Sequence, residues 1–302
     1  MRSLPFLLLA TGLFTCSGDP AYGTTTAETA TAADSSSTAP ATGPPRPVLV
    51  WETDTVLTTC ESVLYDAERD RLYVANIEGK PWELDGAGSI SLVSLDGRVT
   101  RRDWVRGLNA PKGMGLSGGR LYVADVDALA EIDVAAARLV QRHAVPGAGA
   151  LNDVTVTPDG TVYVSDSETG RIHRLGGGGT FTTVAEGIDR PNGLLALSND
   201  ELLSGNTGGG AELATLTVAD GKRVPRVAGV GPDGIVALGE GRYLLSRWRG
   251  QVDYVAADWT ATTILDTTAD ELQSADIEYV PGQRLLLVPT FFGNKVMAYR
   301  LD

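Results

Sequence analysis

The 302-residue sequence contains few of the residues that build covalent cross-links or transition-metal sites. It has two cysteines and two histidines, which excludes a disulfide framework, a cysteine-rich zinc or iron–sulfur site and a three-histidine metal site within one chain. Basic residues are also scarce, because 25 Lys and Arg stand against 38 Asp and Glu and give a net charge of −13. Such a chain cannot neutralise a run of phosphates, so we expect no nucleic-acid partner.

Aromatic residues are few as well, at 6% of the chain, whereas there are 36 glycines. From Val48 onward the sequence consists of short strand patterns separated by turn residues, and no long segment has a helical period. This pattern predicts an all-β fold, and the chain is long enough to bury a large core.

Residues 1–16 have the pattern of a secretory signal peptide. Arg2 is followed by an apolar run that is too short to span a bilayer. The run ends in Leu-Phe-Thr-Cys at residues 13–16, which resembles a bacterial lipobox, whose cysteine becomes the lipidated first residue of the mature chain. The sequence therefore predicts export and a lipid anchor at Cys16, which would hold the protein to the membrane in the periplasm or at the cell surface. An ordinary secretory signal, and hence a secreted protein, is the alternative.

Residues 17–46 are mostly Ser, Thr, Ala, Pro and Gly, with a few acidic residues. A segment of this composition cannot bury enough apolar surface to fold. We expect it to be a disordered tether between the predicted anchor and the folded domain.

A strand-ending motif recurs six times in the remaining residues, 47–302. The clear copies are 72–76, 121–125 and 162–166, and the weaker copies are 202–206, 243–247 and 286–290. Successive copies begin 49, 41, 40, 41 and 43 residues apart. A period of roughly 40–50 residues with four strands per unit indicates a β-propeller, here with six blades. Segment 48–52 then adds an outer strand to the last blade and closes the ring. A large β-sandwich is the alternative, but it does not explain the constant period.

The same spacing places polar residues at equivalent positions. About fourteen residues before each motif end lies the start of the preceding strand, which in a propeller lines the central channel. The six residues at these starts are Glu61, Lys112, Asn152, Asn192, Asp233 and Asp276. We expect them to form a ring at one mouth of the channel. A second polar ring nearby is predicted from the motif ends Asn76, Asp125, Asp166, Asn206 and Arg247.

Three acidic residues, one lysine and two asparagines give the first ring a charge of −2. Carboxylates held this close repel one another unless they are protonated or neutralised. A divalent cation would balance the ring, and because every candidate ligand atom is an oxygen, a hard ion such as calcium is favoured over zinc.

Structural interpretations of single motifs stay open. Pro191-Asn192-Gly193 and Pro232-Asp233-Gly234 are turn signals on their own, and a plain ion pair between Lys112 and Asp276 is a further alternative. The register shared by six blades favours the ring. The two histidines, His143 and His173, lie outside both ring registers and are predicted to be structural or exposed, and Trp104, Trp248 and Trp259 are expected to serve packing.

The set of Glu61, Asn152-Asp153, Pro191-Asn192-Gly193 and Pro232-Asp233-Gly234 resembles the SMP-30/gluconolactonase/LRE-like family over roughly residues 48–302. The resemblance implies a six-bladed propeller with calcium or another divalent cation, such as Mg²⁺, Mn²⁺ or Zn²⁺, in the channel. It also implies hydrolysis of sugar lactones or related esters. By resemblance, Glu61, Asn192 and Asp233 are metal ligands, and Asn152 contacts the substrate and approaches the metal.

One hypothesis is therefore a metal-dependent hydrolase of a lactone or ester. The metal would polarise the carbonyl group, and Asp233 or Asp153 would act as the general base for water. Lys112 would contact the leaving group or the acid group, and the candidates for substrate contact are Asn152, Lys112 and Asp276.

The other hypothesis is a non-catalytic envelope propeller that binds a ligand or a protein partner and uses calcium as a structural ion. A departure from the family pattern supports it, because Ala150 stands where the family often has a substrate-contacting arginine. Either way, a closed propeller needs no partner for stability, so we expect a monomer. Fold alone does not separate the two hypotheses, because function depends on the site.

Overall fold

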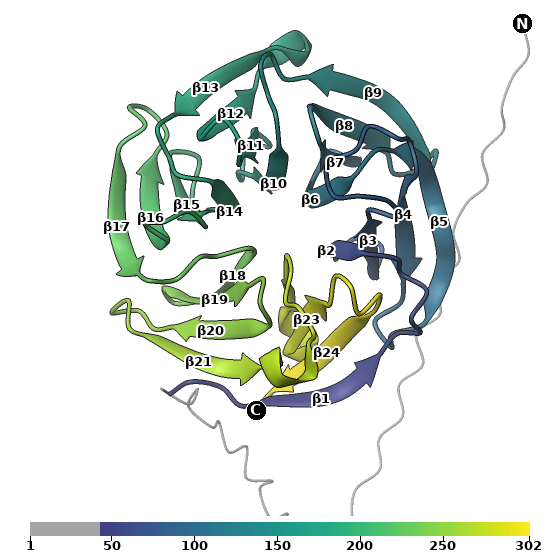
Figure 1. Ribbon diagram of the computed structural model, residues 1–302, viewed down its shortest axis with the longest axis vertical. Helices are drawn as coiled ribbons and strands as arrows, with labels where there is room; N and C mark the ends of the chain where they lie inside the picture. The colour runs from purple at the N-terminus through teal and green to yellow at the C-terminus, as the bar shows by residue number, and fades with distance from the viewer. Residues whose placement is uncertain (1–42) are drawn as a thin grey trace, which may run out of the picture. The chain divides into compact units, whose positions relative to one another are not determined.

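Six antiparallel sheets of four strands each surround a central channel (Figure 1). The structure is a computed structural model that describes residues 43–302, and it confirms the all-β, six-bladed propeller predicted from the repeat. The predicted signal peptide, its Cys16 and most of the predicted tether lie outside the described residues. Among the residues described, no helix is long and apolar enough to span a bilayer.

In each blade the strands run in order from the channel to the outside. The first three blades contain β2 (Cys60–Asp66), β3 (Arg71–Asn76), β4 (Gly88–Val93) and β5 (Val99–Leu108); β6 (Pro111–Ser117), β7 (Arg120–Asp125), β8 (Ala128–Asp133) and β9 (Arg138–Ala144); and β10 (Leu151–Val156), β11 (Val162–Asp166), β12 (Arg171–Leu175) and β13 (Phe181–Ala185).

The other three blades follow the same order. They contain β14 (Pro191–Ala196), β15 (Glu201–Asn206), β16 (Glu212–Thr217) and β17 (Arg223–Ala228); β18 (Ile235–Gly239), β19 (Arg242–Arg247), β20 (Gln251–Val255) and β21 (Ala261–Asp266); and β22 (Glu278–Val280), β23 (Leu285–Pro289), β24 (Val296–Leu301) and β1 (Pro47–Glu52). Three short 3-10 helices are Gly177–Gly179, Thr268–Asp270 and Pro281–Gln283.

The ring closes at blade 6, where the two ends of the described chain meet. On the outside, β1 pairs with β24 in antiparallel register, with Pro47 opposite Leu301. On the inside, the Asp276 backbone N–H donates to the Glu61 carbonyl at 2.9 Å, and the Tyr65 N–H donates to Glu278 Oε2 at 3.0 Å. Blade 6 is therefore bonded to the start of the chain at its outer edge and to blade 1 at the channel.

The hydrophobic core lies between neighbouring blades. One cluster joins Tyr73 and Ile90 of blade 1 to Met114 and Val123 of blade 2, and comparable clusters join the other blades. The alternation of each strand explains this arrangement, because successive side chains point to opposite faces and both faces of a blade are covered by its neighbours. The blades hold the inner strands rigidly, and these strands carry the polar residues of the channel.

Candidate functional site

The strand registers place five of the predicted ring residues at equivalent positions. In four blades, the residue just before the ring residue pairs with the last residue of the second strand: Cys60 with Asn76, Pro111 with Asp125, Leu151 with Asp166, and Pro191 with Asn206. The ring residues Glu61, Lys112, Asn152 and Asn192 follow directly, and Asp233 stands two residues before Ile235, which pairs with Leu245. All five side chains are buried.

Asp276 does not occupy the ring position of blade 6. In blade 4, Leu194 pairs with Ser204 and the ring residue stands two positions before Leu194. In blade 6 the counterpart of Ser204 in the repeated motif is Val288. Because Glu278 pairs with Leu287, Val288 stands opposite Ile277. Ile277 therefore takes the place of Leu194, and Ala275 takes that of the ring residue. The β22–β23 hairpin is one residue longer than that of blade 4, and counting back from the strand end therefore selects the wrong residue.

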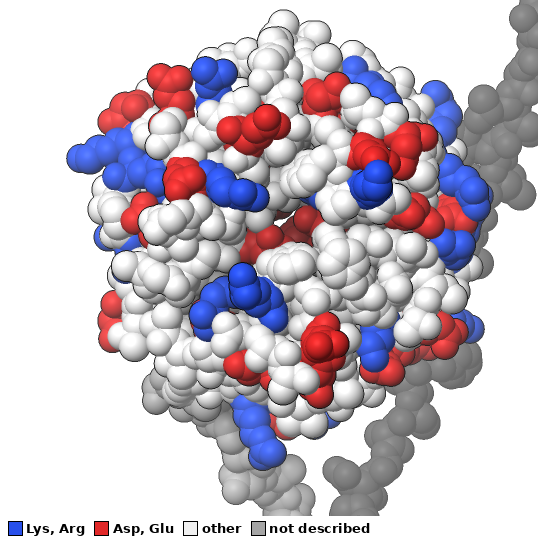
Figure 2. All heavy atoms as spheres, in the orientation of Figure 1, with Lys and Arg blue, Asp and Glu red and all other residues white. Residues whose placement is uncertain are grey.

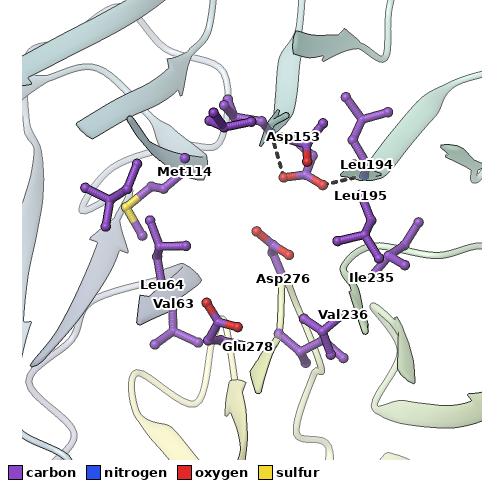
Figure 3. Close-up of a pocket in the computed structure, with 16 residues that line it drawn as sticks. Val63, Leu64, Met114, Asp153, Leu194, Leu195, Ile235, Val236, Asp276 and Glu278 are labelled. Atoms are coloured by element: carbon purple, nitrogen blue, oxygen red, sulfur yellow. Dashed lines mark hydrogen bonds between the residues drawn. The ribbon is translucent and has the colours of Figure 1, made fainter. Parts of the chain in front are cut away.

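Asp276 belongs with Asp153 to the next layer of the channel. Both carboxylates project into the channel from different blades, as Figure 3 shows. Asp153 accepts hydrogen bonds from the backbone N–H groups of Leu194, at 2.5 Å, and Val154, at 2.6 Å. Asp276 accepts one from Ser62 Oγ at 2.9 Å. These carboxylates therefore bind neighbouring inner strands to one another as well as lining the channel.

Glycine at the corresponding position of other blades makes room for these carboxylates. A Cβ atom on Gly113 would overlap the Asp153 carboxylate, and one on Gly234 would overlap that of Asp276. No larger residue fits against either carboxylate. The Gly residues that follow Lys112 and Asp233 in the sequence are thus explained by packing within the channel.

Within the ring, the amide nitrogens of the two asparagines donate hydrogen bonds to neighbouring side chains. Asn192 Nδ2 donates to Asp233 Oδ1 at 2.5 Å, and Asn152 Nδ2 donates to Ser167 Oγ at 3.1 Å. Both carboxamide oxygens are left as potential ligands. Glu61 Oε2 and Asp233 Oδ2 are buried and accept no hydrogen bond within the described part of the chain. Two unpartnered carboxylate oxygens in a buried position are costly unless a cation or a proton satisfies them.

Burial is the main cause of the shifted acidities of this group. It raises the pKa of Glu61 to about 8, and the nearby carboxylates of Asp233 and Asp153 add to the rise while Lys112 opposes it. Burial also raises the pKa of Asp233 to about 6 and that of Asp153 to about 8. The pKa of Asp276 is raised well above its ordinary value by burial and by the other carboxylates. Mutual repulsion in a poorly solvated channel is what a bound cation would relieve.

Lys112 is only 2% exposed, and its ammonium forms no ion pair with any residue that the structure describes. The predicted alternative of a Lys112–Asp276 ion pair is therefore not formed. Instead, Lys112 Nζ lies 4.2 Å from the centre of the Trp82 ring. Burial lowers the pKa of Lys112, and the carboxylates of Glu61 and Asp233 oppose that shift.

Below the ring, the channel contains a cavity of about 270 Å³. Most of the residues that line it are apolar, among them Met114, Leu194 and Ile235, while Asp153, Asp276 and Glu278 supply its acidic groups (Figure 3). Acidic side chains are visible inside the hollow at the centre of the ring in Figure 2. The channel thus contains an acidic cavity.

These residues fit a hard divalent cation. Across residues 43–302, no group of three or more His, Cys, Asp or Glu is arranged to hold a metal. The ring instead offers the carboxylates of Glu61 and Asp233 together with the carboxamide oxygens of Asn152 and Asn192. A set made only of oxygens suits calcium better than zinc.

The predicted second ring is a set of structural side chains. Asp125 Oδ1 accepts hydrogen bonds from Asn109 N and Ala110 N, and Asp166 accepts from the backbone that leads into β10. Asn76 and Asn206 likewise bind neighbouring backbone, and Arg247 pairs with Asp253 at 2.9 Å. These residues hold the connections between strands, which explains why they recur with the repeat.

The histidines and most tryptophans lie away from the ring. His143 contacts Glu131 on the outer strands of blade 2, and His173 lies opposite Thr183 in blade 3. Trp104 packs on Tyr73 in a tilted arrangement with ring centres 5.2 Å apart, and Trp259 stacks on Tyr243 with ring centres 5.7 Å apart.

Trp82 was not among the sequence-predicted site residues. It lies in the segment 77–87 between β3 and β4 and is outside the repeated pattern. Spacing therefore gives no signal for it. The unusual length of that connection is the feature that could have drawn attention to it.

No family model and no curated protein matches this sequence. Solved structures do match its fold. A gluconolactonase from Xanthomonas campestris superposes with a TM-score of 0.65 at 18% identity, over 86% of this chain and 97% of that one. A structural-genomics target named as a gluconolactonase gives 0.65 at 17% identity, over 85% and 92%. A catalytically inactive virginiamycin B lyase from Staphylococcus aureus, solved with quinupristin, gives 0.58 at 11% identity, over 85% and 99%. At these identities the likeness establishes the propeller fold.

Proposed function

We propose that this protein is a hydrolase of a lactone or ester that depends on a divalent cation, with calcium the best fit. The observation that carries the proposal is the pair of buried, unpartnered oxygens, Glu61 Oε2 and Asp233 Oδ2, beside two asparagines whose amide nitrogens are already engaged. Likeness in fold to a gluconolactonase, and to a structural-genomics target named as one, supports the reaction class.

The ion would be held by Glu61, Asn152, Asn192 and Asp233. When bound, a divalent cation supplies polarisation of a carbonyl group and stabilises the negative charge that develops on its oxygen. Asp276 is not proposed as a ligand, because Ala275 takes the ring position in its blade.

Asp233 is the better of the two predicted general bases. Its Oδ2 has no hydrogen-bond partner, whereas both oxygens of Asp153 accept backbone N–H groups. Asp233 would take a proton from water as the water oxygen attacks the carbonyl carbon. When the carbon–oxygen bond of the ester breaks, the same proton returns to the leaving alkoxide. Asp153 then serves to position the inner strands.

Lys112 and Asn152 would orient the substrate. The Lys112 ammonium is free of ion pairs in the described part of the chain and lies at the mouth of the channel beneath Trp82. It can hold the leaving oxygen or an acid group of the substrate. Asp276 would face the substrate from the channel side, where it lines the cavity.

A lyase reaction like that of the virginiamycin B lyase is less favoured. The comparison structure is a histidine-to-alanine variant described as catalytically inactive. Both histidines of this chain lie on outer strands of blades 2 and 3, away from the ring. The ring therefore offers no imidazole for such chemistry.

We also propose that the protein is exported and anchored through Cys16, with residues 17–46 as the tether and a small-molecule substrate reached outside the cytoplasm. This proposal rests on the sequence pattern of the first 46 residues. Labelling with a palmitate analogue in a bacterial host tests it. Wild type should incorporate label and Cys16→Ser should not. An unlabelled wild type would mean that the protein is secreted without a lipid anchor.

The decisive test of the enzyme is turnover of a panel of lactones and esters by chelator-treated and calcium-loaded protein. We expect turnover only with the cation, and Asp233→Asn should lose at least about a hundredfold in rate while melting cooperatively. Calcium binding without turnover of any member would support the non-catalytic binding propeller. The absence of binding would remove the metal-hydrolase mechanism.

A further inference from the structure

The connection between β3 and β4 is long compared with its counterparts on the same face. It runs from 77 to 87, whereas β7 and β8 are joined by Val126 and Asp127 alone. Both of its ends are anchored: Glu78 pairs with Arg102 at 2.9 Å, and the Gly86 N–H donates to Asn109 Oδ1 at 3.2 Å. The segment therefore has a defined position over the mouth of the channel.

Trp82, in the middle of this segment, reaches across to blades 3 and 4. It forms one wall of a cavity of about 330 Å³ whose other walls are Gly149, Ala150, Ser167, Glu168 and Arg190. Trp82 itself comes from blade 1, so the indole ring extends across the edge of the channel. A cavity of this size accommodates a substituent with about one additional ring.

The cavity adjoins the ring at two points. Lys112, in blade 2, lies under the indole of Trp82 at 4.2 Å, and the hydroxyl of Ser167 accepts a hydrogen bond from Asn152 at 3.1 Å. A molecule whose reacting group sits at the ring would therefore place its substituent against Trp82. The two spaces belong to one binding region.

The walls nearest the ring offer few hydrogen-bond partners to the hydroxyl groups of a sugar. Gly149 and Ala150 present no polar side chain, and the Ser167 hydroxyl already donates to the Pro191 carbonyl at 2.6 Å. Charged groups are present in the exposed side chains of Glu168 and Arg190. Trp82, which is 43% exposed, gives a flat apolar surface. A polyhydroxylated substituent packed against Trp82 and Ala150 would lose contacts with water that these two side chains do not replace.

We infer that the substrate carries a flat apolar substituent, such as a fused aromatic ring, which packs on Trp82 in the space next to Ala150. This inference rests on the proposed function for the position of the reacting group. It assigns Trp82 as the residue that determines specificity. Polyhydroxylated lactones are then poorer substrates, because only the exposed, well-solvated Glu168 and Arg190 could hydrogen-bond their hydroxyls, whereas Trp82 and Ala150 could not.

Hydrolysis-resistant lactams test the inference by binding rather than by turnover. The probes are δ-valerolactam, its benzo-fused counterpart 3,4-dihydro-2-quinolinone, and the lactam of gluconic acid, each titrated calorimetrically into the full chain with calcium. We expect the benzo-fused lactam to bind at least about tenfold more tightly than either of the others. Trp82→Ala should abolish this preference, and Trp82→Phe should retain most of it.

Trp248→Ala is the matched control. Trp248 is also a half-exposed tryptophan, but it packs on Phe291 and does not line the cavity. The preference for the benzo-fused lactam should persist in Trp248→Ala. Equal binding of the lactams, no binding by any of them, or a preference that persists in Trp82→Ala would overturn the inference. Failure of the proposed function would show differently, as intact lactam selectivity in a protein that turns over no ester.

Discussion

Lys112 Nζ lies 4.2 Å from the centre of the Trp82 ring, although the two residues come from different blades. The indole face contacts this buried charge directly, whereas no carboxylate of the described chain lies within ion-pair distance of it. The lysine therefore keeps its charge available to a ligand in the channel. It also stands close enough to the proposed ligands to influence a cation bound there.

Replacing Lys112 by Met should strengthen calcium binding and weaken turnover. The ammonium opposes a second cation in the same buried space, so its loss should improve calcium affinity by about tenfold or more. Turnover should fall because the group that orients the substrate is gone. Lys222→Met removes the same charge from an exposed position and should change neither quantity. Unchanged or weaker calcium affinity in Lys112→Met would contradict this electrostatic picture.

Glu61→Gln and Asp276→Asn should distinguish a cation bound at the ring from one bound deeper in the channel. Glu61 has a buried unpartnered oxygen at a ring position, so its amide variant should weaken calcium binding by about a hundredfold. Asp276 is one residue out of the ring register and already accepts from Ser62 Oγ, so Asp276→Asn should weaken binding less than about tenfold. Calorimetric titration measures both. A larger loss in Asp276→Asn than in Glu61→Gln would mean that the cation sits deeper in the channel.

The contrast between Glu61 and Asp276 shows how far the repeat alone can be used. Spacing predicted the blade number and the inner-strand positions of Glu61, Lys112, Asn152, Asn192 and Asp233, because each blade repeats one packing unit. It failed at Asp276 because hairpin length varies between blades. A one-residue difference in a hairpin changes the position of every residue that is located by counting from the far strand.

Other features had no sequence signal because they arise from contacts between blades. The hydrogen bond from Leu194 N to Asp153 joins blades 3 and 4, and the segment with Trp82 approaches residues of blades 2, 3 and 4. Neither contact is encoded in a local pattern. Motif-end residues such as Asp125 were predicted to form a second polar ring near the first, yet they bind the backbone of connecting segments, because both roles recur with the same period.

Calcium binding should release protons near neutral pH. Burial raises the pKa of Glu61 to about 8, so in the metal-free protein this carboxyl is largely protonated at pH 7 and must ionise to bind a cation. Apparent affinity should therefore rise between pH 6 and 8 and level off above about pH 9. Calorimetry in buffers of different ionisation enthalpy counts the protons. An affinity that does not change over this range would show that the ligands are already ionised.

Gly113→Ala should destabilise the domain by about 2–4 kcal/mol, because the new methyl group would overlap the carboxylate and the backbone of Asp153. That carboxylate cannot move away without losing the hydrogen bonds from Leu194 and Val154. Gly177→Ala is the control, since open space surrounds its Cβ position. Urea denaturation of both variants measures the difference. Equal stability of the two would mean that blades 2 and 3 can separate at the channel without cost.

Glu278 makes the stability of the ring closure depend on pH. Burial raises its pKa from 4.5 to about 7, although Tyr65 N–H and Tyr279 N–H donate to it. The folded state thus favours the protonated carboxyl, and this contribution to stability is complete below about pH 4.5 and is lost as the pH rises through 7. Glu278→Gln imitates the protonated form, so its stability relative to wild type should increase from pH 5 to pH 8 in urea denaturation. Glu240→Gln, at an exposed site, should show no such trend. A constant difference between Glu278→Gln and wild type would mean that Glu278 stays ionised in the folded channel.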